Sequence, residues 1–236
     1  MNFIKDFAHI VILLFFTAKM FIIDCYASEL SNLGLHVIPY PQQVEVGGND
    51  FKLNSSLTIE LDVNSTDVDR QTAEKLKKEL GETWGIVATL GEGNGGSTVI
   101  LSKQADIKTI GDQGYQLTTD HDVLTITAND EDGLFYGIQT FFQLIKKSRG
   151  RIFVPGMKIT DWPDVKIRAV HYDTKHHQDK ASYVKDFIKD LARYKINMLV
   201  WEWEDKFAYQ SHPEIGAPGA FTMAEMQEFT RLGNTT

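Results

Sequence analysis

The alternation of hydrophobic and polar residues divides the chain into two parts of different texture. In the first part, short segments such as 57–61 alternate apolar with polar positions, which is typical of half-buried strands. A helix is predicted over 67–80, with Gly81 ending it. A hairpin is predicted within 114–128, its turn at 119–122. These signals indicate a sheet with at least one helix.

A second helix is predicted from an N-cap at Asp130 to about Lys147, ending near Gly150. Its apolar residues follow the stripe expected of a helix that packs on a sheet, namely Leu134, Ile138, Phe141, Phe142 and Ile145. Strands followed by a helix on one face predict an α+β domain, which we assign to residues 28–164.

After residue 164 the pattern changes. The predicted elements are a strand at 165–172, a helix at 180–195, a strand at 196–203 and a helix at 222–232. The strand at 196–203 is almost continuously apolar, which predicts burial on both faces. Thr222 is expected to cap the last helix, with Glu225 completing a capping box. The order strand–helix–strand–helix predicts two parallel βα units over residues 165–236.

Residues 1–27 have the features of an export signal. Lys5 precedes the apolar run 10–16, and small residues follow at Ala27 and Ser28. A membrane anchor needs about 20 consecutive apolar residues, and the polar residues on either side of this run make it too short. We therefore expect an exported protein, periplasmic or extracellular, without an integral membrane span after signal removal.

Cys25 is the only cysteine, and it lies inside the predicted signal. Cleavage after Ala27 leaves no thiol, so no disulfide framework is expected. The alternative is a bacterial lipid anchor on Cys25. The residues that precede it, 22–24 (IID), fit that alternative less well, because small residues are expected before a lipidated cysteine.

Composition narrows the classes of partner. The chain has 24 Lys and Arg against 32 Asp and Glu, a net charge of −8, and its 42% hydrophobic residues are ordinary for a globular protein. An acidic chain lacks the basic surface that nucleic acids require. We therefore expect no nucleic-acid partner.

Candidate chemistry lies where the two predicted strands end, because functional side chains of βα folds gather at the carboxyl ends of strands. The first segment, 168–177, contains Arg168 and Asp173 among several histidines. His171 and His176 match no ligand spacing, so neither a metal nor another cofactor is expected. Arg168 offers several donors to sugar hydroxyls. A surface ion pair is the alternative, disfavoured by the apolar residues on both sides.

The second segment, 201–205, reads Trp-Glu-Trp-Glu-Asp. Alternation places Glu202 and Glu204 on one face and Trp201 and Trp203 on the other. Aromatic rings beside carboxylates suit sugars, which stack their C–H faces on rings and donate hydroxyl hydrogens to carboxylates. A solvated strand end with core tryptophans explains the same pattern, and both interpretations stay open.

Three stretches resemble the bacterial β-N-acetylhexosaminidases of glycoside hydrolase family 20. They are 36–44 (HVIPYPQQV); 114–117 (GYQL) with 126–128 (ITA) and 133–140 (GLFYGIQT); and 159–163 (ITDWP) leading to Arg168 and Asp173. The resemblance implies a small α+β domain followed by a (β/α)8 catalytic barrel. It also implies release of terminal β-linked N-acetylhexosamine by a substrate-assisted retaining route, in which the acetamido oxygen of the substrate attacks the anomeric carbon.

In that family an Asp orients the acetamide and the adjacent Glu protonates the leaving oxygen. Neither Glu202 nor Glu204 aligns with this pair, so no catalytic residue is assigned, and the chain is expected to be an inactive, truncated fragment that ends after two βα units. Arg168 matches the arginine that holds hydroxyls of the terminal sugar, and it is the main substrate-binding candidate together with Asp173, Glu202 and Asp205.

The sequence also departs from the family pattern. Ala169 replaces a glycine, and 200–206 (VWEWEDK) replaces the tract HWHLTDD, keeping Trp201 and Asp205. The expected partners are glycans that contain N-acetylhexosamine. Two alternatives are a non-catalytic carbohydrate-binding or scaffold module, and a glycosidase of another family with the same domain plan.

Overall fold

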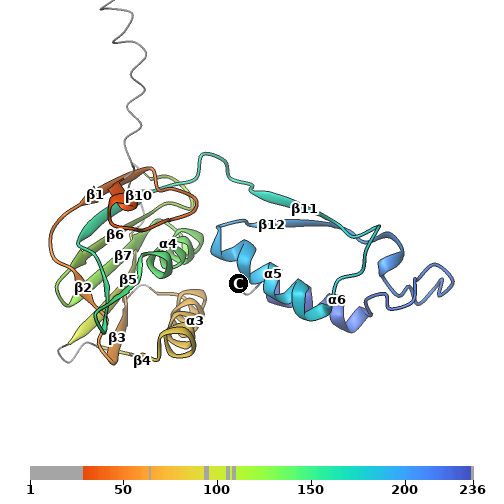
Figure 1. Ribbon diagram of the computed structural model, residues 1–236, viewed down its shortest axis with the longest axis horizontal. Helices are drawn as coiled ribbons and strands as arrows, with labels where there is room; N and C mark the ends of the chain where they lie inside the picture. The colour runs from red at the N-terminus through yellow and green to blue at the C-terminus, as the bar shows by residue number, and fades with distance from the viewer. Residues whose placement is uncertain (1–28, 64, 93–95, 105–106, 108–109, 235–236) are drawn as a thin grey trace, which may run out of the picture.

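The computed structural model describes residues 29–63, 65–92, 96–104, 107 and 110–234, which form two units (Figure 1). The first unit runs to Asp161 and holds a mixed sheet with two long helices. The second unit holds two parallel strands and two helices. The predicted signal at 1–27 and its Cys25 lie outside the described residues.

A seven-stranded sheet with the order β1-β10-β6-β7-β5-β3-β4 is the centre of the first unit. Its strands are β1 (Gln43–Val46), β3 (Ser56–Leu61), β4 (Val87–Leu90), β5 (Ser97–Lys103), β6 (Tyr115–Asp120), β7 (Val123–Ala128) and β10 (Met157–Asp161). The β1-β10-β6-β7 half is antiparallel, and the β7-β5-β3-β4 half is parallel. The predicted hairpin is confirmed as β6–β7, although its turn is confined to His121 and Asp122.

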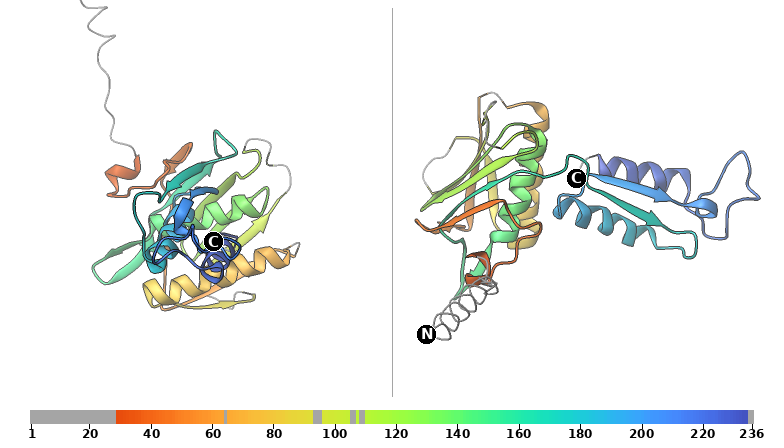
Figure 2. Two further views of the ribbon diagram at one scale, coloured as in Figure 1. Left: turned by 90° about the vertical axis from the view of Figure 1, so that its right-hand side faces the viewer. Right: turned by 90° about the horizontal axis from the view of Figure 1, so that it is seen from above.

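Helices α3 (Asp67–Trp84) and α4 (Glu131–Leu144) cover one face of this sheet, the face toward the second unit (Figure 2). Asp130 caps α4 as predicted, its carboxylate accepting a bond from the Gly133 amide at 2.7 Å. The predicted stripe faces the core, where Leu134 and Ile138 are buried. Hydrophobic burial between the helices and the sheet is therefore the main source of the stability of this unit.

Both predicted helix ends in this unit are wrong. Helix α3 continues through Gly81 and ends at Trp84, because the left-handed C-cap conformation falls on Gly85, with φ 68°. Helix α4 ends at Leu144 rather than near Lys147. The following residues form β8 (Lys146–Ser148), which pairs with β9 (Arg151–Val154). Strand β2 (Phe51–Lys52) pairs with β9 and completes this three-stranded sheet, and the β8–β9 ladder takes the place of helix continuation.

The second unit has the predicted order of strand, helix, strand and helix. Its elements are β11 (Ala169–Asp173), α5 (Ala181–Arg193), β12 (Met198–Glu202), a short 3-10 helix η1 (Glu204–Lys206) and α6 (Met223–Gly233). The strands are parallel, with Ala169 opposite Met198 and Asp173 opposite Glu202. The predicted capping box on α6 is confirmed, since the Thr222 hydroxyl accepts a bond from the Glu225 amide and the Glu225 carboxylate accepts one from the Thr222 amide.

The prediction that the second strand is buried on both faces is wrong. The side chain of Val200 is 48% exposed and that of Met198 is 43% exposed. Helices α5 and α6 pack against one face, where Val184 and Phe229 are buried, and no described element covers the other face. Strand β11 also begins later than predicted, at Ala169 rather than residue 165.

Lys195 joins the two units. It follows α5, has a positive φ of 60°, and is only 5% exposed. Its Nζ donates hydrogen bonds to Oδ2 of Asp161 at 2.8 Å and to the hydroxyl of Tyr115 at 2.9 Å. The Tyr115 hydroxyl is also 2.6 Å from Oγ1 of Thr140, on α4. The cation of one unit is thus buried among polar groups of the other.

Candidate functional site

The two parallel strands end side by side, and this brings two of the four predicted site residues together. Asp173 and Glu202 are register partners at the carboxyl ends of β11 and β12. His171, two residues earlier on β11, places its Nε2 3.1 Å from Oε2 of Glu202. These side chains lie on the face of the strand pair that the helices leave open.

Lys175, which was not among the predicted site residues, connects the carboxylates. Its Nζ lies 3.3 Å from Oε1 of Glu202, 3.6 Å from Oε1 of Glu204 and 3.8 Å from Oδ2 of Asp173. The hydrogen bond to Glu202, with the charges of all three carboxylates, raises the pKa of Lys175. The ammonium therefore stays charged and holds three like charges together. We name Asp173, Lys175, Glu202 and Glu204 the strand-end cluster.

Asp173 is fixed by the backbone amide of Lys175. The amide of Lys175 donates to its Oδ1 at 2.9 Å, and this bond, with the nearby Lys175 and histidine charges, lowers the pKa of the carboxyl. Asp173 is thus an ionised hydrogen-bond acceptor at neutral pH. Such a group suits recognition of hydroxyl donors and cannot supply a proton there.

The predicted alternation ends with β12. Glu204 lies in η1 with φ 41°, yet Lys175 still brings it beside Glu202. Trp201 is a core residue, with its ring centroid 5.5 Å from that of Phe221. Trp203 is half-buried, and its Nε1 donates to the Tyr209 hydroxyl at 3.2 Å. The core interpretation therefore fits Trp201, and Trp203, whose ring centroid is 6.3 Å from that of Trp201, lines a cavity between the two units that is described below.

Asp205 lies next to the cluster without joining it. Its Oδ1 is 2.7 Å from Nζ of Lys206, and its carbonyl accepts a bond from the Ala217 amide at 2.8 Å. Among the described residues, no contact links its carboxylate to Asp173 or Glu202. The hydrogen bond between the Asp205 carbonyl and the Ala217 amide closes the loop between η1 and α6.

Arg168 lies at the opposite end of the strands. It precedes β11, and its Nη1 donates to Oε1 of Gln113 at 2.8 Å, while its Nε donates to the Lys195 carbonyl at 2.7 Å. The guanidinium lies 4.9 Å from the ring centroid of Tyr136. Arg168 thus contacts both units, through partners that no local sequence pattern links to it, and it does not meet Asp173, Glu202 or Asp205.

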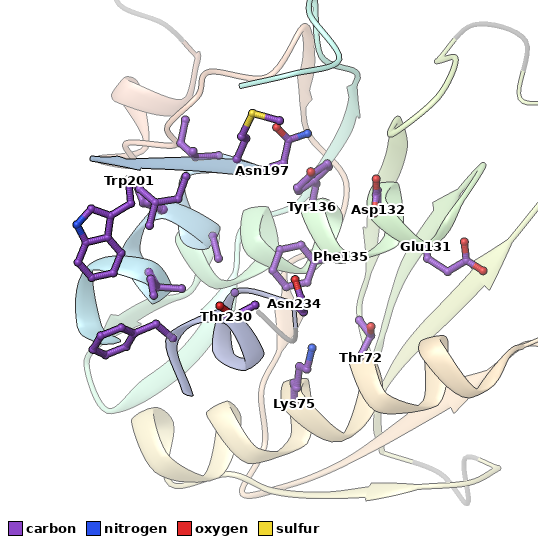
Figure 3. A pocket seen from close by; sticks show the side chains of 18 of the residues that line it. Thr72, Lys75, Glu131, Asp132, Phe135, Tyr136, Asn197, Trp201, Thr230 and Asn234 are labelled. Atoms are coloured by element: carbon purple, nitrogen blue, oxygen red, sulfur yellow. The ribbon is translucent and has the colours of Figure 1, made fainter. Parts of the chain in front are cut away.

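A cavity of about 800 Å³ lies between the two units (Figure 3). Thr72 and Lys75 of α3 line one side, Tyr136 of α4 lines another, and Trp201 and Asn197 belong to the second unit. Burial lowers the pKa of Lys75. None of the four predicted site residues lines this cavity, so we place the candidate site at the strand-end cluster.

The part of the chain that the structure covers was also searched for a metal site and for a membrane-spanning helix. No group of three or more His, Cys, Asp or Glu side chains there is arranged to hold a metal ion. Likewise, no helix among those residues combines the length and the hydropathy needed to cross a bilayer.

Several known proteins resemble this chain. A β-hexosaminidase of Porphyromonas gingivalis is 25% identical over 185 residues, which is 75% of this chain and 23% of that protein. The β-hexosaminidase subunit alpha of Rattus norvegicus is 32% identical over 114 residues, 46% of this chain and 22% of that subunit. The chain thus spans about a quarter of the length of these relatives.

Solved structures give the same result for the fold. A family 20 β-N-acetylhexosaminidase of Streptomyces coelicolor superposes with a TM-score of 0.73 at 27% identity, covering 84% of this chain and 44% of that one. A Streptomyces plicatus β-hexosaminidase variant in complex with its product GlcNAc gives 0.71 at 29% identity, covering 84% and 43%.

A match to a family model covers more than half of the chain. Residues 34–162 match the model for domain 2 of glycosyl hydrolase family 20. They include the seven-stranded sheet, both long helices and the buried Asp161. The alternative of a glycosidase from another family is thereby removed. The chain belongs to glycosyl hydrolase family 20.

Proposed function

We propose that this chain is the sugar-binding front part of an exported β-N-acetylhexosaminidase, with the terminal N-acetylhexosamine bound at the strand-end cluster. The observation that carries the proposal is the convergence of Asp173, Glu202 and Glu204 on Lys175 at the carboxyl ends of two parallel strands. Carboxylates accept hydrogen bonds from sugar hydroxyls. The GlcNAc bound to the Streptomyces plicatus relative supports the choice of sugar.

The fold part of the proposal is that residues 28–164 form the N-terminal domain and residues 165–236 the first two βα units of a (β/α)8 barrel. Helices on one side of β11 and β12 leave His171 and Val200 on the open side, as on the inner face of a barrel. In such a barrel the strand-end cluster lies at the face where active sites are built.

Within this proposal the chain binds the sugar and does not cleave it. In the substrate-assisted reaction, the acetamido oxygen attacks the anomeric carbon while an acid protonates the leaving oxygen. Asp173 is ionised at neutral pH, since its pKa lies below an ordinary value of 3.8, so it cannot donate that proton. Glu202 accepts from Lys175 and contacts His171, which suits it to accept hydroxyl hydrogen bonds. We assign no catalytic acid, and no metal or other cofactor, to this chain.

Calorimetry with N-acetylglucosamine tests the binding. We expect heat from the wild-type chain at millimolar ligand, and roughly tenfold weaker binding in Glu202→Gln, which loses one charge-assisted acceptor. Glu214→Gln is the matched control, since that carboxylate is exposed and only contacts His212. No heat from the wild type defeats the proposal, and it defeats the alternative of a non-catalytic carbohydrate-binding or scaffold module as well.

A hydrolysis assay tests the proposal that the chain does not cleave the sugar. We expect no turnover of a chromogenic N-acetyl-β-glucosaminide by the full chain of 236 residues. Turnover above the rate measured without protein would contradict the absence of a catalytic acid. Export is tested separately, by mass spectrometry of the secreted protein, where a mature N-terminus at Ser28 is expected and an N-terminal lipid on Cys25 would contradict it.

A further inference from the structure

The three-stranded sheet β2–β9–β8 carries a cluster of cations without ion-pair partners. Lys52, Lys147, Arg149 and Arg151 are exposed, and none lies within 4.0 Å of a carboxylate in the described residues. The chain as a whole has a net charge of −8. An acidic protein that leaves several cations unpaired on one small sheet has a local positive field there. We name these four residues the basic sheet.

A cavity of about 430 Å³ adjoins the basic sheet. Lys52 and Arg151 contribute to its lining, together with Trp84 at the end of α3 and Phe153 of β9. Trp84 is half-buried and packs against the hydrophobic core, so its ring is held in place. The Arg151 guanidinium lies 5.9 Å from the ring centroid of Phe153. The cavity thus combines two cations with two aromatic rings.

The one carboxylate that lines this cavity already has a backbone partner. Oδ1 of Asp50 accepts a hydrogen bond from the Gly156 amide at 3.0 Å. The amide group of Asn54 is fixed on its nitrogen side, where Nδ2 donates to Oγ of Ser97 at 2.8 Å. The lining therefore offers positive charge and one oriented amide oxygen to a ligand.

We propose that this cavity and the basic sheet bind an anionic saccharide, a chain with carboxylate or sulfate groups. The aromatic rings stack on the C–H faces of sugars, and the cations pair with the acidic substituents. A flexible basic surface alone fits any polyanion, but a cavity with a fixed indole selects a ligand that has apolar ring faces as well as charge. The overall acidity of the chain disfavours nucleic acid.

The inference deepens the proposed function and rests on it, because it names the substrate class as acidic glycans. The first unit alone forms this cavity, and it shares no residue with the strand-end cluster. In Figure 1, β2 lies on the side of the first unit away from α5 and α6. The anionic chain is held here, while its terminal N-acetylhexosamine belongs at the strand-end cluster.

Calorimetry on the full chain with a chondroitin sulfate hexasaccharide tests the inference. We expect binding that weakens as salt is added, roughly tenfold weaker affinity in Arg151→Glu and a similar loss in Trp84→Ala. Trp84→Phe should restore most of the affinity and shows that the ring, rather than folding, is responsible. Lys78→Glu is the matched charge control, because that side chain is exposed on α3 and contacts only Glu82.

The inference is overturned by an absence of binding in the wild type, or by equal losses in Arg151→Glu and Lys78→Glu. A DNA duplex that binds as tightly as the hexasaccharide overturns it in favour of a general polyanion surface. N-Acetylglucosamine separates the two proposals, because Arg151→Glu should leave its binding unchanged. Binding of that sugar without the hexasaccharide defeats only this inference, and the reverse result defeats only the strand-end site.

Discussion

Nζ of Lys195 lies 2.8 Å from Oδ2 of Asp161, and the two residues belong to different units of the molecule. Burial lowers the pKa of the Lys195 ammonium, and the neighbouring Asp161 charge opposes that effect. Burial also raises the pKa of Tyr115 well above its usual range, so its hydroxyl stays protonated and donates a hydrogen bond to Asp161. The junction is therefore a satisfied polar network rather than an apolar contact.

Lys195→Met is expected to lower the free energy of unfolding by about 3 kcal/mol, because it leaves the Asp161 carboxylate buried without its cation. Urea denaturation measures this value. Lys189→Met on the same helix is the control, since Lys189 is exposed and bonds only Asp186, and its effect should stay within about 0.5 kcal/mol. Equal stability of the two variants would show that the buried pair does not hold the units together.

Arg168→Ala is expected to cost about 2 kcal/mol of unfolding free energy, because it removes the hydrogen bonds to Gln113 and to the Lys195 carbonyl and the contact with Tyr136. Arg168→Lys should recover only part of this, since an ammonium cannot reproduce the planar donor set. The sugar contact predicted for Arg168 is tested by the same variant. Loss of N-acetylglucosamine affinity at unchanged stability would assign the guanidinium to the sugar rather than to the junction.

The pair of Lys103 and Glu131 makes stability depend on pH. The hydrogen bond from Lys103, 2.7 Å long, lowers the pKa of Glu131 below its ordinary value of 4.5. A carboxyl with a lowered pKa in the folded state stabilises the fold above that ordinary value, and the contribution disappears as the pH falls through the folded pKa. Glu131→Gln should therefore cost a few tenths of a kcal/mol at neutral pH, a small value because the side chain is partly exposed.

Urea titrations of the wild type and Glu131→Gln between neutral and acidic pH check this sign. The difference between the two proteins should shrink below pH 4.5. In a Lys103→Gln background the same substitution should have a smaller effect, because only the backbone hydrogen bond of Glu131 then lowers its pKa. A difference that grows toward acidic pH would contradict the assignment.

The rates of amide hydrogen exchange should differ between strand β5 of the first unit and strand β12 of the second. Strand β5 lies between β3 and β7, with Val99 and Leu101 fully buried. Strand β12 pairs only with β11 among the described strands, and Val200 is exposed. The amides of β12 should exchange roughly a hundredfold faster than those of β5. Equal, slow protection in both strands would show that β12 is far more stable than its burial indicates.

Local signals in the sequence predicted correctly where a helix begins when a side chain caps its first turn. Asp130 and Thr222 each cap a helix with an oxygen that lies at the expected distance from the backbone. The end of α3 was harder to predict, because Gly81 and Gly85 both suit a C-cap and only the packed structure decides between them. The residues after α4 form a hairpin in which β8 pairs with β9, and β9 pairs in turn with β2, so periodicity alone extended that helix too far.

The candidate site could be predicted only in part, for a similar reason. Parallel pairing of two strands predicts that Asp173 and Glu202 meet, and the structure places them opposite each other. Lys175 could have been found from its position just after a strand end that carries a carboxylate. The partners of Arg168 could not, since Gln113 and Tyr136 lie in another unit and no pattern near Arg168 indicates them.

The buried lysine also gives the molecule a direction of assembly. Tyr115 and Asp161 precede Lys195 in the chain, so a ribosome completes the receiving network before it synthesises the cation that enters it. Domains generally fold in the order of their synthesis. The first unit thus serves as a template on which the second is seated. A substitution at Thr140, which contacts the Tyr115 hydroxyl, would therefore slow the folding of the second unit, although that unit lies in a different part of the chain.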